Sequence, residues 1–109
     1  MLLLPVTLTS REARDTLRML KQALQSEGVD GPVIVNAAPL QQLDSAALAV
    51  LLEIERLAAA WGRAFAVRAA PAKLTALAKL YGVDVLLLRP EPGSGAAVAA
   101  AAGQRRPPM

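Results

Sequence analysis

The chain alternates short apolar runs with longer segments in which apolar residues recur at every third or fourth position. The short runs, at residues 2–8, 32–37, 64–68 and 85–88, predict strands, and the segments between them predict helices. The predicted order is β-α-β-α-β-α-β with short connections. This order predicts a single α/β domain, built on a four-stranded sheet that is covered by helices.

Turn and cap residues set the predicted ends of these elements. Pro5 moves the first strand toward a sheet edge or a bulge, because proline cannot donate a ladder hydrogen bond. Thr9 with Glu12 three positions later has the spacing of a capping box and predicts the start of the first helix. Glycines predict the helix ends, at Gly28, Gly62 and Gly82.

Each predicted helix has an apolar face for the core. The residues of these faces are Ala13, Leu17, Leu20 and Leu24 in the first helix, Ala47, Val50, Leu51, Ile54, Leu57, Ala58 and Trp61 in the second, and Leu74, Leu77, Ala78 and Tyr81 in the third. The 32–37 run is apolar enough to predict a strand covered on both faces. Charged residues outside these faces, such as Arg63, Arg68 and Lys79, are expected at the surface.

Composition narrows the classes of function. Hydrophobic residues make up 54% of the chain and charged residues 19%, which indicates a folded core. The net charge of +3 is modest, and no dense basic face for nucleic acid is visible. The absence of Cys and His removes thiol and imidazole catalysis and the common metal sites. We therefore expect no enzyme activity, no cofactor and no metal.

Composition also divides the chain. Residues 1–89 hold the predicted domain, and residues 90–109 are a low-complexity stretch of Pro, Gly, Ala and Ser that predicts a disordered tail. The apolar residues 1–8 lack the basic start and cleavage site of a signal peptide. No run approaches the roughly 20 apolar residues of a membrane span. These features predict a domain without direct insertion into a membrane, and the absence of Cys is compatible with the cytosol.

The candidate site is the junction that precedes the second helix. Asp44 and Ser45 stand at the predicted helix start, where either side chain can cap free backbone N–H groups. Leu48 and Leu52 lie about 100° around the helix from its predicted core face. Either a neighbouring helix covers these leucines, or Asp44, Ser45, Leu48 and Leu52 form a partner-binding patch.

Two segments resemble the STAS domain family of sulfate transporters and anti-sigma-factor antagonists. Residues 44–47, Asp-Ser-Ala-Ala, resemble the Asp-Ser/Thr-small-Gly motif at the start of the family's long second helix. Residues 77–83, Leu-Ala-Lys-Leu-Tyr-Gly-Val, resemble the third-helix end of the MlaB-type members. Those members are small cytoplasmic subunits of the Mla phospholipid-transport ABC complex. The likeness covers residues 33–88, with a looser fit over the first helix.

The resemblance implies a non-enzymatic STAS subunit that binds the ATPase of an inner-membrane ABC phospholipid transporter, and through it the permease. The subunit would assemble or regulate this complex at the cytoplasmic face of the membrane, and the transporter would maintain outer-membrane lipid asymmetry. In MlaB-type proteins the residue that corresponds to Ser45 lies in the surface that engages the ATPase.

The same resemblance allows an alternative, an anti-sigma-factor antagonist in which Ser45 is the phospho-acceptor. Two departures from the family pattern weigh against it. Ala47 stands where the family has Gly, and the chain is expected to open with one strand instead of the family's pair. A small hydrolase is a third class, and no constellation of residues in the sequence supports it.

Overall fold

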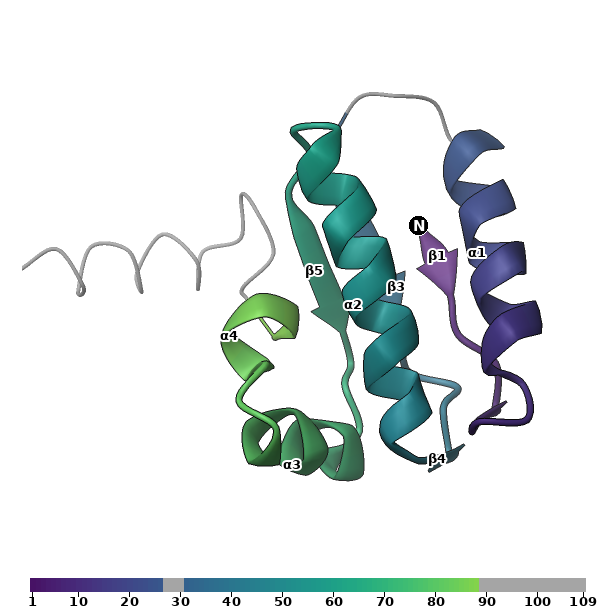
Figure 1. Cartoon of the computed structure of the whole chain (residues 1–109), viewed down its shortest axis with the longest axis vertical. Helices are drawn as coiled ribbons and strands as arrows, with labels where there is room; N and C mark the ends of the chain where they lie inside the picture. The colour runs from purple at the N-terminus through teal and green to yellow at the C-terminus, as the bar shows by residue number, and fades with distance from the viewer. Residues whose placement is uncertain (27–30, 89–109) are drawn as a thin grey trace, which may run out of the picture.

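Three short parallel strands form the centre of the molecule, in the order β1-β3-β5 (Figure 1). The structure, a computed structural model, describes residues 1–26 and 31–88. Strands β2 and β4 form a separate two-stranded parallel sheet. The elements are β1 (Leu2–Leu3), β2 (Thr7–Leu8), α1 (Ala13–Ser26), β3 (Val33–Asn36), β4 (Gln42–Leu43), α2 (Ser45–Ala60), β5 (Phe65–Arg68), α3 (Ala72–Leu80) and α4 (Asp84–Leu87).

One face of the three-stranded sheet carries much of the core. Leu2 lies opposite Val35, and Val35 lies opposite Val67, so these side chains share that face. Helices α1 and α2 lie side by side over the sheet (Figure 1). On the other face Leu3 of β1 is 58% exposed, whereas Ile34 of β3 is half-buried and Ala66, which lies opposite Ile34, is fully buried. The second face of β3 is therefore covered in part.

The first apolar run, predicted as one strand, is divided into β1 and β2. Pro5 lies between them, and the chain changes from pairing with β3 to pairing with β4. The Val6 carbonyl accepts hydrogen bonds from the backbone N–H groups of Gln41 and Gln42, at 2.8 and 3.0 Å. The β2–β4 pair thereby holds the loop before α1 close to the start of α2. The chain opens with two short strands in different sheets, where the sequence predicted one.

The run at residues 85–88, predicted as the fourth strand, forms the short helix α4 instead. Helix α3 is nine residues long and lies across the carboxyl end of β5 (Figure 1). A parallel neighbour of β5 would have to begin at the opposite end of the sheet, and α3 does not return the chain there. Helix α4 packs beside β5 with Leu87 buried, while Val85 is 69% exposed.

Several predicted helix ends are confirmed. The Thr9 N–H donates to Glu12 Oε1 at 2.9 Å, and the Thr9 hydroxyl donates to the same oxygen at 2.6 Å. These hydrogen bonds hold the pKa of Glu12 below its usual value, because they favour the charged carboxylate. Gly62 and Gly82 follow α2 and α3 with φ of +69° and +73°, a conformation that glycine adopts without a steric penalty.

Trp61 and Tyr81, which precede these two glycines, were predicted to lie in the core, but both are exposed. Trp61 is 44% exposed and Tyr81 is 58% exposed. Each is the C-cap of its helix, with ψ near 5° and 1°, so the regular helical period has ended there. The predicted core face is therefore one residue too long at the end of both helices.

Arg63, predicted at the surface, is buried with 8% exposure. Its Nε donates to the carbonyl oxygen of Gly31 at 2.7 Å, so the guanidinium joins the loop before β3 to the loop before β5. Arg68 and Lys79 are exposed as predicted. The predictions for Gly28 and for residues 90–109 concern positions outside the described residues.

Candidate functional site

The site begins where α2 begins, and Asp44 organises that end. Asp44 is the N-cap, and its Oδ1 accepts a hydrogen bond from the Ala46 N–H at 2.8 Å. Its second oxygen, Oδ2, accepts from the Ser10 N–H at 3.2 Å. Of the two residues that were candidates for the cap, the structure assigns the role to Asp44. Ser45, the first helical residue, is left exposed.

The two leucines of the predicted patch lie at different depths. Leu48 is 4% exposed and belongs to the hydrophobic core, whereas Leu52 is partly buried against that core. Helices α3 and α4 both contact α2. The sequence left open whether these two leucines are covered or exposed, and the structure buries Leu48 while it covers Leu52 only in part.

An apolar groove lies between α2 and the turn that joins α3 to α4. It has a volume of about 280 Å³. Its lining residues come from both sides, and they are Ser45, Leu48, Ala49, Leu52, Tyr81 and Val83. Leu48 forms the buried floor, and the exposed Ser45, Ala49 and Tyr81 form the rim. The predicted patch and the exposed Tyr81 therefore belong to one surface.

The lining of the groove is mostly apolar. Its polar groups are the hydroxyls of Ser45 and Tyr81, and its other lining side chains are aliphatic. A pocket of this kind favours an apolar group from a partner and can fix its orientation with a few hydrogen bonds. Within residues 1–26 and 31–88, no cluster of acidic side chains that could hold a metal ion is present.

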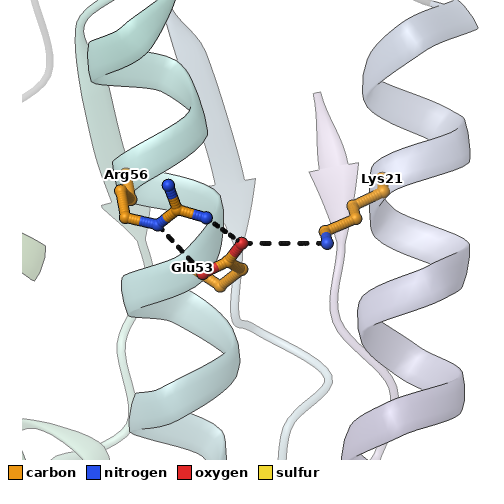
Figure 2. A network of polar contacts seen from close by, with 3 residues as sticks. All are labelled: Lys21, Glu53 and Arg56. Carbon is orange, nitrogen blue, oxygen red and sulfur yellow. Dashed lines mark hydrogen bonds and ion pairs between the residues drawn. The ribbon is translucent and has the colours of Figure 1, made fainter.

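A polar network fixes α1 against the side of α2 (Figure 2). Glu53 Oε1 accepts from Arg56 Nε at 3.1 Å, and Glu53 Oε2 lies 2.5 Å from an Arg56 guanidinium nitrogen and 3.7 Å from Lys21 Nζ. Arg56, first, and then Lys21 hold the pKa of Glu53 below its usual value. The network links the two helices, and none of its three residues lines the groove.

The groove contains some of the residues that the sequence singled out and others that it did not. Ser45, Leu48 and Leu52 line the groove together, whereas Asp44 caps the helix and is not among the lining residues. Ala49 and Val83 were not selected as site residues, and Tyr81 was assigned to the core. Tyr81 and Val83 both lie in the 77–83 segment, so the family resemblance of that segment was the available signal.

One comparison with known proteins identifies a domain family for this fold. The family model described as "Mlab, STAS domain" matches residues 4–89 of the chain. The search of curated proteins found no match. In the described part of the chain, no helix is both long enough and apolar enough to cross a membrane.

Proposed function

The chain belongs to the MlaB-type family of STAS domains, and we propose that it is a non-enzymatic subunit of an ABC phospholipid transporter. Its partner is the ATPase of that transporter, and through the ATPase it is linked to the permease. The complex works at the inner membrane and maintains outer-membrane lipid asymmetry. The chain itself stays on the cytoplasmic side and holds no cofactor.

One observation carries this proposal. The groove joins the two segments of the chain that resemble the family, because Ser45 lines it from one side and Tyr81 and Val83 line it from the other. These segments are separated by β5 and most of α2 and α3 in the chain. Their convergence on one apolar surface supports docking of a protein partner there.

The geometry also indicates how such a subunit would act. The floor of the groove is already packed in the free chain, so little ordering is needed when a partner side chain enters. The subunit can influence the ATPase only if it binds one conformational state of the ATPase more tightly than another. Nucleotide binding and hydrolysis remain with the partner.

The test uses a variant that fills the groove without disturbing the core. Ala49 is exposed on the rim, so Ala49→Arg places a long charged side chain across the groove. Ala60→Arg is the matched control, because Ala60 is exposed in the last turn of the same helix and does not line the groove. The tag follows Met109, since Leu2 is buried at the other end.

Each tagged chain is purified from its native host in mild detergent, and the bound proteins are identified by mass spectrometry. We expect an ABC ATPase and its permease with the wild-type chain and with Ala60→Arg, and loss of both with Ala49→Arg. Recovery of the ATPase with all three chains would show that the groove is not the docking surface. Absence of any ABC ATPase from all three would refute the proposed partner.

The anti-sigma-factor antagonist stays the second candidate, because Ser45 is exposed at the first position of α2 and accessible to a kinase. A phosphate there would lie beside the Asp44 carboxylate, which already accepts the Ala46 N–H. Recovery of a serine kinase, together with phosphate on Ser45 of the wild-type chain, would favour this candidate over the transporter subunit.

A further inference from the structure

An exposed apolar strip follows the groove along the chain. It consists of Leu80 and Tyr81 at the end of α3 and Val85 and Leu86 in α4, which are 76%, 58%, 69% and 42% exposed. All four lie within seven consecutive residues, on two short helices that pack against each other. Apolar side chains exposed in such a concentration indicate a surface that another protein covers.

One basic residue precedes the strip in the chain, and one acidic residue lies within it. Lys79 precedes it in the last turn of α3 and is exposed, and Asp84 lies in the first turn of α4 and is half-exposed. Among the described residues neither side chain has an ion-pair partner. The strip therefore carries one positive and one negative group at different positions along its length.

We propose that the strip is the interface of a two-fold symmetric dimer of this chain. A two-fold axis brings the same surface of both copies together, so residue i of one copy meets residue j of the other and the reverse. With Leu80, Tyr81, Val85 and Leu86 facing their counterparts, Lys79 of each copy pairs with Asp84 of the other. The apolar side chains and the charges are then satisfied by a second copy of the same sequence.

The dimer would also regulate docking, a consequence that rests on the proposed function. Tyr81 belongs to both the strip and the rim of the groove. A second copy that covers Tyr81 would exclude a partner from the groove, so the chain would dissociate before it joins its complex. The dimer itself requires no transporter and is tested with the purified chain alone.

Sedimentation velocity of the full chain over a wide concentration range measures the association. We expect a reversible monomer–dimer equilibrium with Kd on the order of 10–100 µM, because a small interface belongs to the weak class. Lys79→Glu and Asp84→Lys should each raise Kd about tenfold, since each replaces two attractive pairs by two repulsive ones. Arg14→Glu is the control, because Arg14 is exposed on α1 and not on the two helices of the strip, and should leave Kd unchanged.

Mixing the two charge variants gives the decisive result. One variant then offers two acidic groups at positions 79 and 84 and the other offers two basic groups, so the mixture should dimerise more tightly than either variant alone. This result cannot arise from loss of folding. A wild-type chain that stays monomeric throughout would overturn the proposal, and so would a dimer that is insensitive to both changes, since it would use another surface.

Discussion

Removal of the Asp44 side chain should destabilise the domain measurably, because its two oxygens bind two different segments. Oδ1 caps α2 through the Ala46 N–H at 2.8 Å, and Oδ2 binds the Ser10 N–H at 3.2 Å. Replacement of a capping side chain by alanine costs about 1 kcal/mol, within a range of about 0.5–2. The longer bond to Ser10 adds about 0.5 kcal/mol, at the low end for a net hydrogen bond. Asp44→Ala should therefore lose about 1.5 kcal/mol.

Urea unfolding followed by far-UV circular dichroism measures this loss, and the dependence of unfolding free energy on urea should stay unchanged. For a domain of this size, about 1.5 kcal/mol corresponds to a fall in Tm of about 6–12 °C. Asp44→Asn separates the two bonds, because its amide oxygen still accepts from Ala46 while its NH₂ group cannot accept from Ser10. We expect Asp44→Asn to lose about 0.5 kcal/mol.

Ser45→Ala is the matched control, since Ser45 is exposed and does not cap the helix. Its effect should lie within about 0.5 kcal/mol, as is usual for surface substitutions. The reasoning would be refuted if Asp44→Ala lost no more stability than Ser45→Ala. Equal losses for Asp44→Ala and Asp44→Asn would show that the cap bond to Ala46 contributes nothing measurable.

Two other predictions address α4 and the network between α1 and α2. Leu87→Ala should cost about 2–4 kcal/mol in urea unfolding because Leu87 is buried, whereas Val85→Ala, at an exposed site, should change stability by less than about 0.5 kcal/mol. Equal effects would contradict the helical assignment of α4. The folded-state pKa of Glu53 is lowered by Arg56, so this carboxylate stabilises the fold above its unfolded value of 4.5, and that stabilisation is lost as pH falls through the folded pKa. The stability difference between wild type and Glu53→Gln should therefore be present at pH 7 and shrink below pH 4.5; a difference that is constant with pH would refute it.

Helices α1, α2 and α3 could be predicted from the sequence because local signals fix their ends. Thr9 with Glu12, Gly62 and Gly82 mark ends that depend on backbone geometry within a few residues, and the structure confirms them. The apolar run at 85–88 carries no such signal, since a short apolar run fits a buried strand and a helix equally well. The tertiary structure decides whether this run forms a strand or a helix, because that depends on where the end of α3 lies relative to the sheet.

In the candidate site too, one part could be predicted from local sequence and the other part depends on how the helices pack. Ser45, Leu48 and Leu52 follow from the periodicity of one helix, and the structure places them along one groove. The opposite wall, Tyr81 and Val83, depends on how α3 and α4 pack against α2 and could not be derived from spacing. The depth of Leu48 has the same origin, because a helical period gives the direction of a side chain and does not reveal what covers it.

The position of Leu48 constrains how this surface can diverge among related proteins. Leu48 is both a core residue and part of the groove lining, so a substitution there alters the core and the shape of the groove together. Ala49 and Tyr81 are exposed on the rim and are free of that double role. Selection for a new partner can therefore act on the rim at little cost in stability. We expect that, among related proteins with different partners, the residues at positions 49 and 81 vary, while the residue at position 48 stays aliphatic.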